Sequence, residues 1–101
     1  MKKNPLSLPE LPRQKDKDIL IISQGYPEAD FKRIIRALHL KVTHQRLAIL
    51  KALHEGRRHV TAQELFEMIN GDHPEIGFAT VYRFLFSLSD ARFVMDFCVG
   101  V

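Results

Sequence analysis

The chain has 101 residues and a single cysteine, Cys98. One thiol cannot form a disulfide within its own chain, and this usage is typical of a reducing compartment, so we expect a cytoplasmic protein. Long apolar runs are also lacking. The run at residues 19–22 is far too short to cross a bilayer or to form the core of a secretory signal. These absences argue against a secreted or membrane protein and against a membrane partner.

Catalytic patterns are missing as well. No stretch pairs a nucleophile with a neighbouring base, so the sequence does not indicate an enzyme. A hydrophobic content of 46% over 101 residues fits one domain with a modest core and a small margin of stability.

Positive charge is unevenly distributed, although the net charge is only +3. Residues 1–46 contain ten Lys or Arg against five Asp or Glu, whereas residues 47–101 contain five against seven. The first half is therefore better suited to phosphate contacts. A solvated basic tail would give the same counts, so they support nucleic-acid binding without establishing it.

Four amphipathic stretches predict a mainly α-helical domain. The first begins near Pro27 or Asp30, and the second follows Thr43 as its N-cap. The third begins with a capping box at Thr61-Ala62-Gln63-Glu64 and ends at Asn70-Gly71. The fourth follows Gly77. The side chains expected to face the core are Phe31, Ile34, Ile35 and Leu38, then Leu47, Leu50 and Leu53, then Ala62, Leu65, Phe66 and Ile69, and last Val81, Phe84, Leu85 and Leu88.

The ends of the chain are less regular. Residues 1–25 are rich in proline and charge, which predicts an extended or flexible segment, with residues 19–22 as a short strand or a packed segment. Residues 26–101 are assigned to the folded domain, with Tyr26 as a packing residue before the first helix. Residues 92–99 read as a strand with no second strand after it.

The fourth helix carries the clearest functional pattern. Thr80, Arg83 and Ser87 fall opposite its apolar face and are flanked by Tyr82. A guanidinium beside a phenol near the start of a short helix suits the base edges of a major groove. An ordinary amphipathic helix with one solvated Arg would show the same pattern, so this helix alone does not decide.

A family resemblance rests on three segments. Ala79-Thr80-Val81-Tyr82-Arg83, preceded by Ile76-Gly77, resembles the recognition-helix signature of the ferric uptake regulator (Fur) family. Upstream, in the family's order, lie Leu40-Lys41-Val42-Thr43-His44-Gln45-Arg46 and His59-Val60-Thr61-Ala62-Gln63-Glu64-Leu65. The resemblance covers only the DNA-binding half of such a regulator. It implies a winged helix-turn-helix with three to four helices and a short or incomplete β wing.

The resemblance also implies a function, namely transcription regulation by binding double-stranded DNA, as in metal-responsive repressors of iron homeostasis. Tyr82 and Arg83 would read base edges, and Lys41 would reach a minor groove. Further implied DNA contacts are Thr43, Gln45, Arg46 and Thr80. His39 stands where the family usually has Gly, so we expect backbone strain beside Lys41.

Metal binding is where the chain departs from the family pattern. Family members hold Fe²⁺ or Zn²⁺ mainly through a C-terminal domain that also forms the homodimer, and no segment here matches that domain, as in a truncated member. His59 matches the one metal ligand of the DNA-binding half, but a lone imidazole is a poor site. The other four histidines are scattered along the sequence. We therefore expect no cofactor and DNA binding that does not respond to metal.

Two other functions remain open. The chain could be a protein–protein interaction module, because winged-helix domains also serve as scaffolds and Phe86 is expected to face outward. It could also be a non-functional fragment. The strand at residues 92–99 should find a partner, either in residues 19–22 or in a second molecule through self-association.

Overall fold

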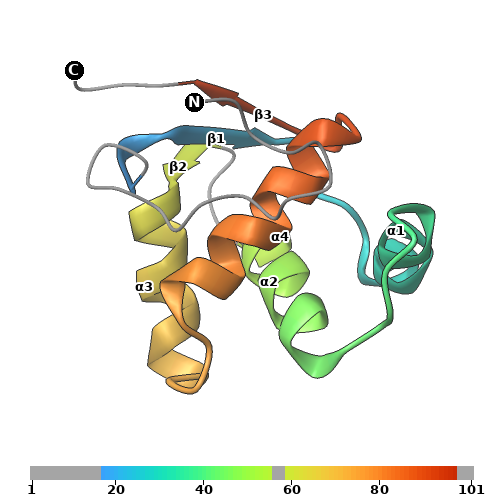
Figure 1. Cartoon of the computed structure of the whole chain (residues 1–101), viewed down its shortest axis with the longest axis horizontal. Coiled ribbons are helices and arrows are strands. Elements are labelled where there is room, and N and C mark those ends of the chain that lie inside the picture. Colours follow the sequence, from blue (N-terminus) through green and yellow to red (C-terminus); the bar gives the residue numbers. More distant parts are fainter. Residues whose placement is uncertain (1–16, 56–58, 98–101) are drawn as a thin grey trace, which may run out of the picture.

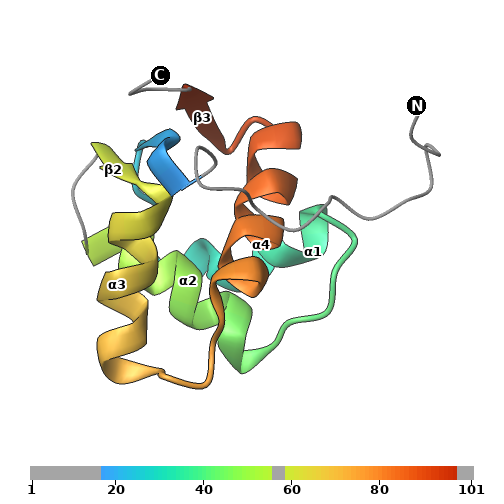
Figure 2. The ribbon, with the colours of Figure 1, turned by 60° about the vertical axis from the view of Figure 1, so that its left-hand side comes forward.

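Four α-helices and three short strands make up the part of the chain that the computed structural model describes, residues 17–55 and 59–97 (Figure 1). The sheet lies on one side of the helices, and α1 lies at the end of the molecule away from α3 (Figures 1 and 2). The elements in chain order are β1 (Leu20–Ser23), a 3-10 turn (Glu28–Asp30), α1 (Phe31–Ala37), α2 (His44–Glu55), β2 (His59–Thr61), α3 (Ala62–Asp72), α4 (Phe78–Asp90) and β3 (Val94–Phe97). This arrangement confirms the predicted mainly α class with a small β element.

Strand β1 is the centre of the sheet. It pairs antiparallel with both other strands, in the order β2-β1-β3, with Ile21 opposite Val60 on one side and Asp96 on the other. Residues 20–23 are therefore a strand, one of the two alternatives that the sequence left open. They also provide the partner predicted for the C-terminal strand.

The helix starts follow local rules. The Thr43 hydroxyl accepts a hydrogen bond from the Arg46 amide at 3.2 Å, which confirms Thr43 as the N-cap of α2. At α3, Thr61 and Glu64 form both halves of the predicted capping box. The end of α3 differs slightly from the prediction. Gly71 does not adopt a positive φ, so the helix continues through it to Asp72 and stops before Pro74.

Two helices end on a left-handed residue that is not glycine. After α1, His39 has φ 62°, the His39 amide donates to Arg36 O at 2.9 Å, and the Leu40 amide donates to Ile35 O at 3.3 Å. After α4, Arg92 has φ 67° and the same pair of hydrogen bonds recurs. Both ends are Schellman motifs, in which glycine is the usual residue at this position. The strain expected at His39 is thus present in the backbone.

The core lies between the sheet and the helices. Most of the predicted inward-facing side chains are buried, and Leu38, Leu47 and Phe66 are partly buried against them. The core also contains Ile21, Ile49, Val60, Ile76 and Val94, which the helical periodicity did not single out. Tyr26 packs as predicted, with its ring edge-on to Phe93 and its hydroxyl donating to Phe93 O at 3.1 Å.

Two of the sequence predictions fall outside the described residues. They are the extended segment before residue 17 and the end of the terminal strand, which includes Cys98. Within the described ranges, no helix is both long and apolar enough to span a membrane.

Candidate nucleic-acid interface

Helix α4 presents the predicted base-reading residues from its N-terminal half. Its inner face is buried through Val81, Phe84, Leu85 and Leu88. Thr80, Tyr82 and Arg83 are all half-buried. At about 100° per residue, Tyr82 and Arg83 flank the outward face of the helix from opposite sides.

Tyr82 and Arg83 differ in how they are held. The Tyr82 ring stacks on Phe78, with centroids 6.5 Å apart, and lines a small cavity beside Ile19 and Ile21. The Arg83 Nε atom is buried and has no hydrogen-bond partner within the described ranges. A buried guanidinium donor without an acceptor is costly.

The loop before α2 is held by the helix that follows it. Arg46 is half-buried, and its Nη1 donates to the Lys41 carbonyl at 2.8 Å. Because Thr43 caps the same helix turn, Lys41, Thr43 and Arg46 form one hydrogen-bonded unit. The Lys41 and Gln45 side chains are exposed beside it. The loop thus has a fixed backbone from which Lys41 projects into solvent.

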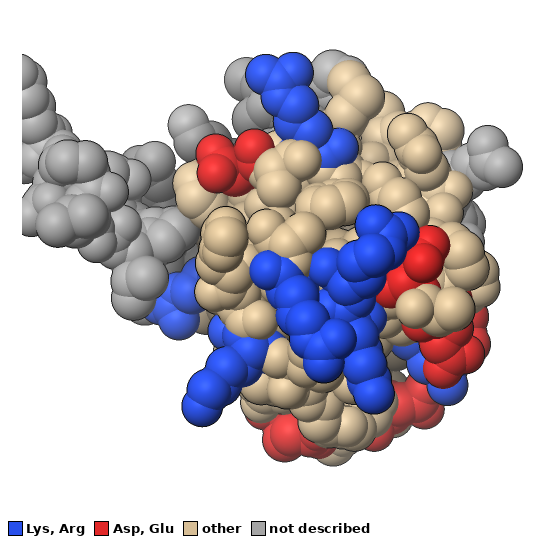
Figure 3. Space-filling model, turned by 90° about the vertical axis from the view of Figure 1, so that its right-hand side faces the viewer, with Lys and Arg blue, Asp and Glu red and all other residues tan. Residues whose placement is uncertain are grey.

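The candidate residues on α4 and those of the loop before α2 lie at the same end of the molecule. His44, the first residue of α2, approaches His73 at 3.3 Å, and His73 begins the connection that leads into α4. Basic side chains gather on the neighbouring face, the one that carries α1 (Figure 3). The exposed cations of α1 and the following loop are Lys32, Arg33, Arg36 and Lys41.

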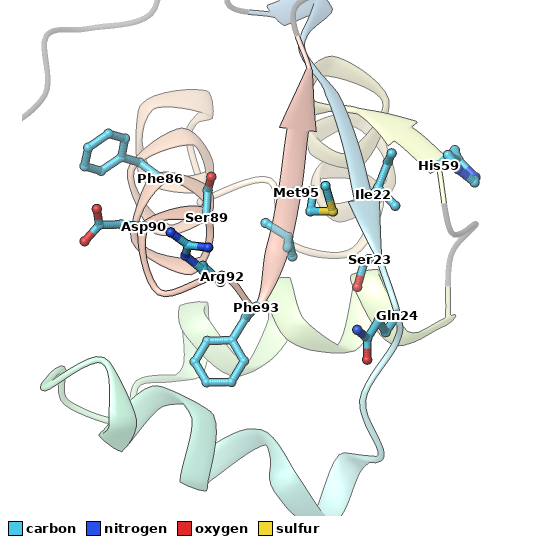
Figure 4. A pocket seen from close by; sticks show the side chains of 11 residues that line it. Ile22, Ser23, Gln24, His59, Phe86, Ser89, Asp90, Arg92, Phe93 and Met95 are labelled. Carbon is cyan, nitrogen blue, oxygen red and sulfur yellow. The ribbon is translucent and has the colours of Figure 1, made fainter.

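His59 lies apart from this end. It starts β2 with an exposed side chain and lines a groove over the sheet together with Phe86 and Met95. Figure 4 shows His59 at the far edge of that groove, pointing away from Phe86 on α4. Across the described residues, His59 joins no group of three side chains able to hold a metal.

A different histidine cluster was missed at the level of the sequence. The side chains of His44, His73 and Glu75 lie close together, although the two histidines were counted among those scattered along the sequence. The two histidines are 29 residues apart, and no spacing rule predicts a contact between the start of one helix and the connection after the next. Only the packing of α2 against α3 brings them together.

The four helices and the small antiparallel sheet define a winged-helix domain. Residues 37–100 match the sequence profile of the ferric uptake regulator family. The chain belongs to this family, as its three motifs indicated. It is thus a member of a family of metal-responsive regulators.

Individual relatives agree with this assignment. The Ferric uptake regulation protein of Campylobacter jejuni is 39% identical over 72 residues, which is 69% of this chain and 46% of that protein. The protein of the same name in Campylobacter upsaliensis is 41% identical over 66 residues, 63% of this chain and 42% of the relative. The Peroxide-responsive repressor PerR of Staphylococcus aureus is 33% identical over 66 residues, 65% of this chain and 45% of the repressor.

The present chain spans a little under half the length of these relatives. No solved structure matches it significantly.

Proposed function

We propose that this chain binds double-stranded DNA with sequence preference and acts in transcription regulation. The observation that carries the proposal is the half-buried Arg83 on α4, whose Nε lacks an acceptor, within a domain of the ferric uptake regulator family. Burial would hold the stem of Arg83 in place, and its terminal guanidinium nitrogens would donate to acceptors on DNA.

Helix α4 would supply the reading of bases. Arg83 would donate to a guanine edge, and Tyr82 would contact the neighbouring base from the other flank of the helix. Thr80, in the first turn, would position a phosphate.

The loop before α2 would fix the register on the DNA backbone. Lys41 would enter a minor groove, drawn by its negative potential. Arg46 would hold the Lys41 backbone through its 2.8 Å hydrogen bond, and its remaining donors, together with Gln45 and the turn capped by Thr43, would meet phosphates.

The experiment begins with selection of bound sequences from a random duplex pool by the purified full chain. Affinity for the selected duplex is then measured by fluorescence anisotropy across salt concentrations. We expect a preferred sequence and a logarithmic affinity that falls steeply with log salt, because each neutralised phosphate releases condensed counterions. Binding without any sequence preference would reject the proposed role of α4.

A second function has its own observation. The groove over the sheet is about 850 Å³ in volume, and Phe86 and Met95 on its walls are 50% and 58% exposed (Figure 4). Such a surface suits a protein partner. In the same assay a protein-binding module would show no DNA selection, and an apolar contact would change little with salt.

A further inference from the structure

Three side chains of metal-binding type come together at the start of α2, where His44 stands between Thr43 and Gln45, two of the proposed DNA contacts. His44 Nε2 lies 3.3 Å from His73 Nδ1, and Glu75 Oε2 lies 3.6 Å from His73 Nδ1 and 3.9 Å from His44 Nε2. Over residues 17–55 and 59–97, no other three His, Cys, Asp or Glu side chains come together in this way.

The separations fit one small divalent ion. A point equidistant from the three atoms lies about 2.1 Å from each of them, which is the length of zinc bonds to imidazole nitrogen and carboxylate oxygen. The two imidazole planes are inclined at 72°, so the rings do not stack face to face. Two imidazoles and one carboxylate also form a donor set that suits zinc and its neighbours in the transition series.

Hydrogen bonding does not account for the position of Glu75. Its distances of 3.6 and 3.9 Å to the two ring nitrogens exceed the length of a hydrogen bond. Charged groups that are exposed or partly exposed gain little from each other at such distances. A cation bound between the three groups would account for the position of the Glu75 carboxylate.

The backbone under all three residues is fixed. His44 is the first residue of α2, directly after the Thr43 N-cap. His73 caps the C-terminus of α3, with its amide donating to Ile69 O at 2.8 Å. Glu75 lies in a turn closed by the Ile76 amide and His73 O at 3.0 Å, and the Ile76 side chain is fully buried. Fixed backbones reduce the entropy lost when the side chains converge on an ion.

Space is available for a further ligand. A groove of about 530 Å³ adjoins the two histidines. The side chains of His44 and Glu75 are 71% and 55% exposed, so an ion can enter from solvent. Lys32 and Lys51 line the same groove and oppose a cation, whereas Glu28 on its wall and Glu75 favour one. Three protein ligands with one open position filled by water are typical of accessible zinc sites.

We propose that His44, His73 and Glu75 bind one divalent transition-metal ion of the zinc type, which joins the start of α2 to the connection between α3 and α4. This site is separate from His59, and it replaces the expectation that the chain binds no metal. The proposal does not depend on DNA binding. Its physical consequence is that the ion stabilises the folded chain, because the three ligands come together only when α2 and α3 are packed.

The test uses the untagged full chain carrying Cys98→Ser, so that the thiol does not compete for metal. Zinc chloride is titrated by isothermal calorimetry, and thermal unfolding is followed with and without zinc. Cobalt chloride serves as a spectroscopic probe, because tetrahedral Co²⁺ gives strong visible absorption. The variants are His44→Gln, His73→Gln and Glu75→Gln, and the matched control is His59→Gln, which removes an exposed imidazole outside the cluster.

We expect one Zn²⁺ per chain, a rise in Tm with zinc, and cobalt absorption in the parent chain. Each of the three cluster substitutions should weaken zinc binding at least tenfold and abolish the rise in Tm, while His59→Gln changes neither. The metal-free Tm of each variant shows whether it remains folded. Equal affinity in the parent and in the two cluster histidine variants would overturn the proposal. So would an equal loss in His59→Gln, or a ratio of one ion to two chains.

Discussion

Arg83 and Arg46 are both half-buried cations, but their donors are used differently. Arg46 gives one donor to the Lys41 carbonyl within its own chain, whereas the buried Arg83 Nε has no acceptor in the described part of the structure. Removing Arg46 therefore disturbs a loop, and removing Arg83 takes away an unsatisfied donor. The two substitutions should have different effects on DNA binding.

Arg83→Ala should reduce the preference for the selected duplex over a scrambled one by about 1–3 kcal/mol, the usual contribution of a bidentate base contact. The measurement is the ratio of the two dissociation constants from fluorescence anisotropy. Arg92→Gly is the matched control, because it removes one charge just beyond the other end of α4 and suits the left-handed backbone there. An unchanged ratio in Arg83→Ala would show that α4 does not read bases.

His39→Gly should stabilise the domain. His39 has φ 62°, a conformation that costs a residue with a side chain about 1–2 kcal/mol. Glycine avoids this cost, but its greater freedom in the unfolded chain lowers the stability by about 0.5–1 kcal/mol. The net gain is therefore about 0–1.5 kcal/mol, and each kcal/mol raises Tm by roughly 4–8 °C for a domain of this size.

Thermal unfolding checks this gain against His54→Gly. His54 lies in α2 and its ring packs edge-on against Phe31, so glycine there should lower Tm. A fall in Tm for both variants would mean that His39 makes a contact that outweighs its strain.

At the scale of elements, β1 shows how two successive residues of one strand differ in their contribution to stability. Ile21 is 3% exposed and faces the core, whereas Ile22, the next residue, is only half-buried. Both are isoleucines in the same strand and pair with the same two strands, but their side chains lie on opposite faces of the sheet.

Ile21→Ala should lower the free energy of unfolding by about 2–4 kcal/mol, because it removes buried methylene groups and leaves a cavity. Ile22→Ala should cost about 1 kcal/mol or less. Urea denaturation of the two variants gives the difference directly. Equal losses would show that the strand does not hold the register described above.

The helices were predictable from sequence because their signals are local. The apolar positions of α4 recur at helical spacing, and the Thr61–Glu64 capping box needs only four adjacent residues. The place of β1 was not predictable, because a short apolar run fits a strand or a packed segment equally well and its partners are distant in sequence. The cluster of His44, His73 and Glu75 was not predicted for the same reason, since tertiary packing alone brings it together.

The sequence named the residues of the candidate interface but not their contacts within the chain. The motifs named Lys41, Arg46 and Arg83, yet spacing could not show that Arg46 bonds to the Lys41 carbonyl or that Tyr82 stacks on Phe78. Side-chain partners of this kind depend on rotamers and burial, which a pattern of residue types does not contain.

At the scale of the whole molecule, the sheet ties the N-terminal part of the fold to its C-terminal part. Both β2 and β3 pair with β1, so a chain that begins at Tyr26 would leave the backbone groups of both strands without this partner. The free-energy cost of the unpaired backbone groups and of the lost Ile21 side chain would together exceed the modest stability of a small domain.

We therefore expect a chain beginning at Tyr26 to lose cooperative thermal unfolding, whereas the full chain keeps it. Circular dichroism measures the transition, and amide chemical-shift dispersion reports on packing. A sharp transition in the shortened chain, with dispersion equal to that of the full chain, would contradict this.

The central position of β1 also has a consequence for synthesis on the ribosome. Strand β1 emerges early, but the register Leu20↔Phe97 requires residues made last among those described. Leu20 and Phe97 are 77 positions apart, so this pairing closes a long loop and is slow relative to helix formation. During translation the helices can form before β3 has been made. Until then, the apolar edge of β1 that pairs with β3 has no partner strand. Nascent chains stalled before β3 should thus be the form of this protein that needs a chaperone.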